Sequence, residues 1–137
     1  MKDSMQENNK ALVLEAFETL FNRRDFAQAA RYWSPDYIQH NPTFEPGREG
    51  LFDTVRALPP SAKFESGVIA AEGDFVMMHG RYSGIGLPAD WIAVDIVRLE
   101  DGVMVEHWDV IQDEATQEQS KSGHPMFGDS FPQRKEG

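Results

Sequence analysis

The sequence predicts an α+β fold in which helices come first and an antiparallel sheet follows. Through about residue 58, apolar residues recur at the three- and four-residue spacing of amphipathic helices. From residue 62 onward the chain instead contains runs of nine or ten residues that favour β-strands, separated by turns rich in Gly and Asp. This division into helices and then strands is typical of α+β proteins, since α/β proteins alternate the two.

Three helices are expected before the sheet. The first spans about residues 5–22, because residues 4–7 read Ser-Met-Gln-Glu, the pattern of a capping box, and an apolar stripe follows at helical spacing. A second, short helix begins after Asp25, a suitable N-cap, and its apolar face would include Trp33. A third covers about residues 51–58 and ends at two consecutive prolines.

Four long strands are expected over residues 63–71, 75–83, 91–99 and 103–112, with a short extended piece at 37–40. Turns of three residues join the first strand to the second and the third to the fourth. Consecutive strands joined in this way form an antiparallel meander. The helices must cover one face of that sheet to bury their apolar sides.

The composition indicates one domain, and we expect it to span residues 1–113, followed by a polar C-terminal tail at 114–137 of which only Met126 and Phe127 would dock. A net charge of −10 argues against nucleic acid and anionic membranes as partners. Without cysteine there is no disulfide, thiolate nucleophile or cysteine-bound metal. No run resembles a signal peptide or a spanning helix, so we expect a cytoplasmic location and no membrane partner.

The strand at 103–112 carries the strongest candidate for a chemical group. Side chains alternate along a strand, so His107 and Asp109 should share one face, and Trp108 and Val110 the other. A carboxylate at this position is costly to bury while charged unless it has partners. The alternative is an aspartate near the strand end that is hydrogen-bonded to a loop, and the strand pattern alone favours that reading.

A second carboxylate is expected on the neighbouring strand. Asp95 interrupts an apolar face, and Asp95 and Asp109 lie at nearly equal distances from the turn at 101–102. If the two strands pair in that register, two carboxylates are adjacent, and their repulsion and desolvation raise one pKa toward the range of general acid–base catalysis. A bulge would separate the two groups, and a buried structural ion pair is the alternative for Asp95.

Two histidines could add hydrogen-bond donors or a second base. His40 ends the extended piece at 37–40, where a structural hydrogen bond is the alternative role. His79 lies on a strand face with Phe75, so it could also lie at the wet end of an apolar surface. No recognised metal-ligand spacing, phosphate-binding loop or serine-hydrolase motif is present, so we expect neither a metal nor a cofactor.

The chain resembles the SnoaL-like polyketide cyclase family of the NTF2-like superfamily. The resemblance is carried by Tyr-Ile-Gln-His-Asn-Pro at 37–42, the two glycines at 47 and 50, and Asp-Ile-Val-Arg at 95–98. It is also carried by Asp-Gly-Val-Met-Val-Glu-His-Trp-Asp-Val-Ile-Gln at 101–112 and Gly-His-Pro-Met-Phe at 123–127. It covers nearly the whole chain.

The resemblance implies a cone-shaped, curved antiparallel sheet that wraps round an apolar pocket under the N-terminal helices, and a homodimer formed through the sheet. Family cyclases close rings by an intramolecular aldol reaction without cofactor or metal. Asp109 matches their acid–base aspartate, whereas Asp95 stands where cyclases tend to carry histidine. His40 or Asn41 matches a pocket-lining position. The expected pocket-lining residues are Trp33, Tyr37, Asn41, Phe52, Phe75, Trp91 and His107.

These expectations lead to a hypothesis and two alternatives. The hypothesis is cofactor-independent proton transfer beside the carbonyl group of a small apolar ligand, by aldol cyclisation or isomerisation. Asp109 would be the base, Asp95 or His79 would orient it, and His40 would bind the substrate oxygen. The alternatives are a module that binds a small ligand without reaction and a dimeric protein whose pocket is filled by its own aromatic side chains.

Overall fold

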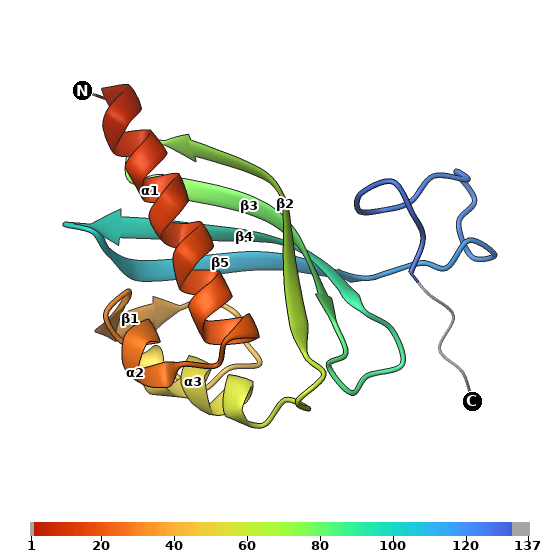
Figure 1. The fold of residues 1–137 in the computed structure, drawn as a ribbon, viewed down its shortest axis with the longest axis horizontal. Helices are drawn as coiled ribbons and strands as arrows, with labels where there is room; N and C mark the ends of the chain where they lie inside the picture. The colour runs from red at the N-terminus through yellow and green to blue at the C-terminus, as the bar shows by residue number, and fades with distance from the viewer. Residues whose placement is uncertain (1, 133–137) are drawn as a thin grey trace.

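The computed structural model describes residues 2–132, and its helices and strands follow one another along the chain in the predicted order (Figure 1). The elements are α1 (Lys2–Phe17), a π-helical turn η1 (Glu18–Asn22), α2 (Phe26–Ala29), β1 (Trp33–Gln39), α3 (Gly47–Arg56), β2 (Lys63–Glu72), β3 (Phe75–Ser83), β4 (Trp91–Glu100) and β5 (Val103–Asp113). The α+β class is therefore confirmed.

The five strands form one sheet in the order β1-β5-β4-β3-β2. Strands β2 to β5 pair antiparallel, as the meander prediction required. Strand β1 adds to the free edge of β5 in the parallel direction, so the whole sheet is mixed. The extended piece predicted at 37–40 is thus part of a longer strand that begins at Trp33.

Strand β1 also corrects the expected end of the second helix. The helix begins where predicted, because the Asp25 carboxylate accepts a hydrogen bond from the Gln28 backbone N–H at 3.1 Å. It ends at Ala29 instead of continuing to Trp33. The backbone N–H of Met104 donates to the Tyr32 carbonyl at 2.8 Å, so pairing with β5 competes successfully with a further helical turn.

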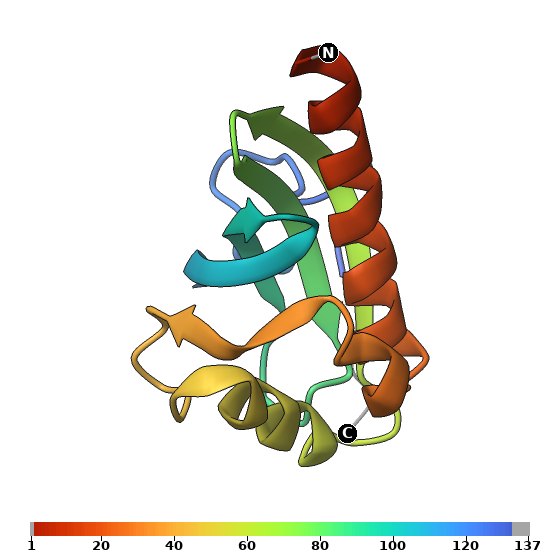
Figure 2. The ribbon, with the colours of Figure 1, turned by 90° about the vertical axis from the view of Figure 1, so that its left-hand side faces the viewer.

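The first helix is fixed to the sheet at its C-terminal end. Asn22, in the π-helical turn, donates to the Phe64 carbonyl at 2.9 Å and accepts from the Phe64 backbone N–H at 2.8 Å. Gly80 on β3 makes room for the Phe64 ring, since a Cβ there would lie 2.5 Å from a ring carbon. These contacts hold α1 along one face of the sheet (Figures 1 and 2).

The hairpin of β4 and β5 has the predicted register, with Asp95 opposite Asp109. A bulge between Arg98 and Leu99 shifts the alternation near the turn. Met104 is therefore buried in the core, and Val105, which strict alternation placed on the face of His107, is only partly buried. The bulge lies beyond the two aspartates and leaves them side by side.

The helices cover one face of the sheet (Figure 2). A core of aromatic and aliphatic side chains fills the space between the helices and the sheet. On the opposite face, part of the C-terminal segment packs against β2 and β3. The Phe127 ring lies against Gly67 and His79 and under the guanidinium of Arg81. No helix among residues 2–132 is long and apolar enough to cross a bilayer.

Candidate functional site

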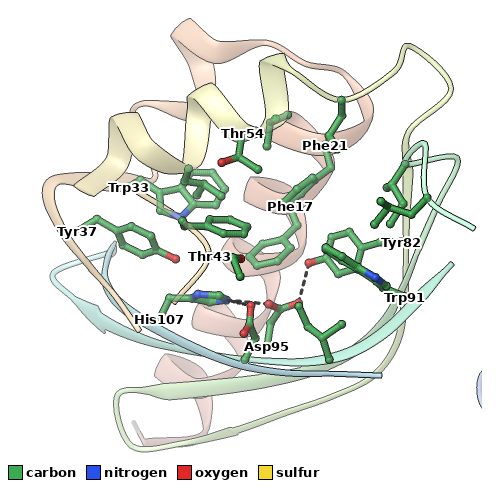
Figure 3. Close-up of a pocket in the computed structure, with 18 residues that line it drawn as sticks. Phe17, Phe21, Trp33, Tyr37, Thr43, Thr54, Tyr82, Trp91, Asp95 and His107 are labelled. Carbon is green, nitrogen blue, oxygen red and sulfur yellow. Dashed lines mark hydrogen bonds and ion pairs between the residues drawn. The ribbon is translucent and has the colours of Figure 1, made fainter. Parts of the chain in front are cut away.

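A cavity of about 260 Å³ lies between the inner face of the sheet and the helices (Figure 3). Its walls are mainly apolar, and the aspartate and histidine side chains that line it, Asp95, His107 and Asp109, all come from β4 and β5. This combination is typical of sites for small molecules. The lining residues are Phe17, Phe21, Trp33, Tyr37, Thr43, Phe44, Leu51, Thr54, Val55, Leu58, Tyr82, Ile85, Leu87, Trp91, Asp95, His107, Asp109 and Ile111.

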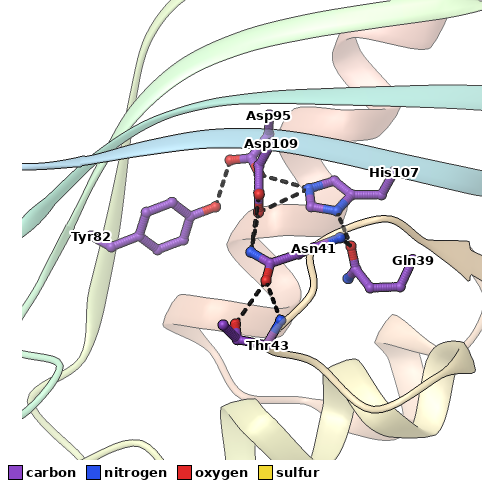
Figure 4. Close-up of polar contacts among 7 residues, drawn as sticks. All are labelled: Gln39, Asn41, Thr43, Tyr82, Asp95, His107 and Asp109. Atoms are coloured by element: carbon purple, nitrogen blue, oxygen red, sulfur yellow. Dashed lines mark hydrogen bonds and ion pairs between the residues drawn. The ribbon is translucent and has the colours of Figure 1, made fainter.

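Three ionisable side chains meet at the floor of the cavity (Figure 4). His107 Nε2 lies 2.7 Å from Asp95 Oδ1 and 3.9 Å from Asp109 Oδ2. The Tyr82 hydroxyl donates to the other oxygen of Asp95 at 2.7 Å. The cross-strand pairing of Asp95 with Asp109 therefore brings both carboxylates to one imidazole, but only Asp95 is hydrogen-bonded to it.

Asn41, in the loop after β1, holds Asp109. Its amide nitrogen donates to both carboxylate oxygens, each at 2.9 Å. Its amide oxygen accepts from the backbone N–H of Thr43 at 2.9 Å and from the Thr43 hydroxyl at 2.7 Å. Because both contacts with Thr43 require an acceptor, they fix the amide orientation that points its N–H groups at Asp109.

Gln39 determines where His107 carries its first proton. The backbone N–H of Asn41 donates to Gln39 Oε1 at 3.0 Å, which identifies that atom as the amide oxygen. His107 Nδ1 lies 2.7 Å from the same oxygen and must therefore donate to it. The 2.7 Å contact between Nε2 and Asp95 then requires one more proton, held either by the imidazole or by Asp95.

The surroundings of Asp109 raise the pKa of its carboxyl group above the ordinary value. Burial is the largest cause, while the Asn41 hydrogen bonds and nearby His107 act in the opposite direction, and Asp95 adds a smaller increase. Burial also raises the pKa values of Tyr37 and Tyr82 well above 10, so both hydroxyls stay protonated at neutral pH. The site thus contains an accessible carboxylate among neutral donors.

The two carboxylates and the imidazole lie close enough together to form a possible cation-binding site. One ligand atom from each of Asp95, His107 and Asp109 lies within 4.8 Å of the others. However, N–H groups of Asn41 already point at both oxygens of Asp109, and the contact of His107 with Asp95 holds a proton. The arrangement suits proton transfer better than metal binding, and we assign no metal role to it.

Most of the predicted site residues are brought together. Asp95, His107, Asp109, Trp33, Tyr37 and Trp91 line the cavity, and Asn41 contacts Asp109 directly. Phe52 is an exception. It is buried outside the cavity, where its ring packs edge-on against Trp33 and Phe26, and it belongs to the core.

The structure corrects the placement of three other residues, which lie on the opposite face of the sheet. His40 stacks on Trp108 with ring centroids 4.7 Å apart, and its Nε2 lies 2.7 Å from Glu106. Phe75 packs against Trp108 from β3. His79 packs against Phe127. None of the three lines the cavity, so His40 cannot bind a ligand oxygen there and His79 cannot orient Asp109.

Sequence reasoning missed three polar members of the site. Tyr82 could have been found from alternation, because it must face away from His79 on the same strand and therefore toward the helices. Gln39 and Thr43 gave no such signal. Their roles depend on contacts between the segment around Asn41 and β5, which lie far apart in sequence.

Comparison with known proteins identifies a family. Residues 13–107 match the SnoaL-like domain. No curated protein sequence matches the chain.

Several solved structures have a similar fold. AclR from Streptomyces galilaeus, described as a candidate hydroxylase, is 28% identical with a TM-score of 0.63, over 79% of this chain and 81% of AclR. A candidate ketosteroid isomerase from Kribbella flavida is 16% identical with a TM-score of 0.71, over 93% of this chain and 97% of that protein. IdmH from Streptomyces antibioticus, a candidate polyketide cyclase, is 21% identical with a TM-score of 0.57, over 72% of this chain and 88% of IdmH.

Proposed function

Because the chain belongs to the SnoaL-like family and has an NTF2-like fold, we propose that it is an enzyme that moves a proton beside the carbonyl group of a small apolar compound, without a cofactor. The observation that carries the proposal is Asp109, whose carboxylate lines an apolar cavity and whose pKa is raised mainly by burial. A carboxylate that is harder to ionise is a stronger base once ionised.

The reaction begins with ionised Asp109. One carboxylate oxygen takes the proton from the carbon next to the carbonyl group, so the C–H bond breaks, an O–H bond forms on Asp109 and the substrate becomes an enolate. In an isomerisation, Asp109 returns the proton to a different carbon. In an aldol cyclisation, the enolate carbon attacks a second carbonyl group of the same molecule, and Asp109 protonates the resulting alkoxide.

The neighbouring groups suit this cycle. Asn41 donates to Asp109 from one side and keeps the carboxylate in a fixed position. His107 and Asp95 share one further proton, so the pair is neutral overall whichever member holds it and places no net charge beside the base. The solved relatives described as a candidate isomerase and a candidate cyclase are consistent with this class of reaction.

A binding module is the second candidate. It is favoured by one observation: both oxygens of Asp109 already accept hydrogen bonds from Asn41, as in a carboxylate with a purely structural role. In that case the cavity would hold a small apolar ligand without changing it.

We further propose that the protein is a homodimer that associates through the face of the sheet opposite the helices, beside the part that the C-terminal segment covers. Outward-facing residues of β3, β4 and β5 form an apolar patch that we call the outer patch, in which Val94 lies opposite Val110 and Ile96 opposite Trp108. Val94 is 37% exposed and Val110 is 69% exposed. A second copy would offer the same apolar patch in return, as two-fold interfaces require. The outer patch consists of Phe75, Met77, Val94, Ile96, Trp108 and Val110.

Deuterium exchange tests the enzymatic proposal. The probe is 2-tetralone, a bicyclic ketone with acidic C–H groups beside its carbonyl, and its exchange in D₂O is followed by proton NMR. We expect the protein to accelerate exchange and Asp109→Asn to abolish the acceleration while ligand binding persists. Asp113→Asn, which alters an exposed aspartate at the end of the same strand, is the control and should behave like wild type. Acceleration that survives in Asp109→Asn would refute the role of Asp109.

A further inference from the structure

One wall of the cavity contains a donor that the proton-transfer cycle does not use. Trp33 is 1% exposed and lines the cavity, yet its indole N–H makes no hydrogen bond to the described residues. Beside it, Tyr37 is 3% exposed, and Figure 3 shows its hydroxyl directed toward the middle of the pocket. A buried N–H without a partner costs stability, so we expect the indole N–H to interact with a nearby oxygen, and the Tyr37 hydroxyl is the group beside it.

We propose that Tyr37, supported by Trp33, donates a hydrogen bond to the carbonyl oxygen of the substrate. An indole N–H can only donate, whereas a tyrosine hydroxyl both donates and accepts. Any hydrogen bond between Trp33 and Tyr37 therefore leaves the phenol proton of Tyr37 free for a ligand. Such a donor would stabilise the negative charge that develops on the oxygen as the enolate forms.

The protonation of Tyr37 supports this assignment. Burial raises the pKa of its hydroxyl well above 10, so the proton is present at neutral pH. The side-chain donor of Trp33 acts in the opposite direction and lowers that pKa. By contrast, the Tyr82 proton is already donated to Asp95.

The same wall and floor define the chemical class of the substrate. Its oxygen must lie near Tyr37 on β1 and its reacting carbon near Asp109 on β5, while its apolar body fills the space beside Phe17 and Phe21. The residues that line the cavity include two aspartates and neither lysine nor arginine. An anionic substrate would therefore be repelled without compensation. The structure assigns a neutral ketone with one oxygen function at the reacting end and a compact apolar remainder.

Infrared spectroscopy of the bound probe tests the oxygen contact independently of turnover. With 2-tetralone labelled with ¹³C at its carbonyl, we expect the C=O stretching band to move to lower frequency on binding, relative to the ketone in an apolar solvent. Tyr37→Phe should remove most of that displacement and slow exchange by roughly 100-fold, the typical cost of losing one oxyanion donor. Tyr32→Phe is the matched control, because Tyr32 precedes β1 and does not line the cavity.

This inference rests on the proposed function, and the outcomes separate the two. If exchange requires Asp109 but Tyr37→Phe leaves both the band and the rate unchanged, the oxygen contact is overturned and the function stands. If wild type accelerates no exchange but shows a band displacement that is lost in Tyr37→Phe, the proposed function fails and the oxygen contact stands.

An undisplaced band in wild type overturns the oxygen contact, even if Tyr37→Phe does not fold. Binding of 2-naphthoate in preference to 2-tetralone overturns the neutral-ketone class.

Discussion

Asp95 and Asp109 face each other across the ladder of β4 and β5, but His107 forms a hydrogen bond with only one of them, at 2.7 Å to Asp95 against 3.9 Å to Asp109. Asp95 is thereby committed to a pair that retains a proton between its members. Asp109 keeps its contacts with Asn41 and faces the cavity. Two like residues in one site acquire different roles because their partners differ.

The pH dependence of stability should reveal the burial of Asp109. Its pKa is raised in the folded protein, so the unfolded chain loses the proton first as the pH rises. The contribution of Asp109 to stability is therefore complete below the unfolded pKa of about 3.9 and is lost as the pH rises through the folded pKa. In urea unfolding from pH 4 upward, we expect wild type to lose stability relative to Asp109→Asn. A difference that stays constant between pH 4 and pH 8 would contradict this reasoning.

Removing Asn41 should move the pH profile of exchange. Asn41 lowers the pKa of Asp109 by donating to the ionised form, so Asn41→Leu should raise that pKa further. The rate of 2-tetralone exchange should increase with pH as Asp109 ionises. In Asn41→Leu, this increase should occur at higher pH. Thr43→Val, which removes one of the two donors that orient Asn41, should give a smaller shift in the same direction. An unchanged pH profile in both variants would show that Asn41 does not control the base.

Much of this architecture could be predicted from local patterns. The turn at residues 101–102 and the alternation along the strands determined the pairing of Asp95 with Asp109, which the structure confirms. The motifs at both ends of the chain also indicated the family that residues 13–107 match. These features depend on neighbours in sequence or across one hairpin, where spacing alone determines the geometry.

Three of the four misplaced site residues, His40, Phe75 and His79, lie on the wrong side of the sheet. The strand pattern placed His79 on one face with Phe75, and that grouping is correct, but it could not show that the helices cover the other face. His40 likewise lies within a motif whose next residue, Asn41, reaches the site. Tertiary packing of the helices decided both cases, and periodicity alone does not contain that information.

Gln39 should control the tautomer of His107. Replacing it with leucine removes the oxygen that accepts the Nδ1 proton while roughly preserving side-chain size. The imidazole would then lose a buried partner, at a cost of about 1–3 kcal/mol in the free energy of unfolding. In wild type, ¹⁵N NMR of His107 should show a protonated Nδ1, and Gln39→Leu should alter that signal. Gln112→Leu, at an exposed site on β5, is the control. An unprotonated Nδ1 in wild type would refute the hydrogen-bond assignment.

A charge in the outer patch should separate the proposed dimer without affecting the cavity. Val110 is 69% exposed, and its side chain lies on the face opposite Asp109. In Val110→Glu, a two-fold interface would bury two unpaired carboxylates, which should weaken association by roughly 100-fold or more. Analytical ultracentrifugation should show a dimer for wild type and a monomer for the variant, with 2-tetralone exchange per chain unchanged.

The control for this experiment is another exposed valine. Val68 is 76% exposed but lies on β2, at the far edge of the sheet from Val110 and outside the outer patch. Val68→Glu adds the same charge to the same residue type, so it should leave the dimer intact. A monomeric wild type, or equal dissociation by both variants, would show that the outer patch is not the interface. Because Val110 and Asp109 point to opposite faces of one strand, loss of exchange in Val110→Glu alone would instead indicate that dimerisation supports the site.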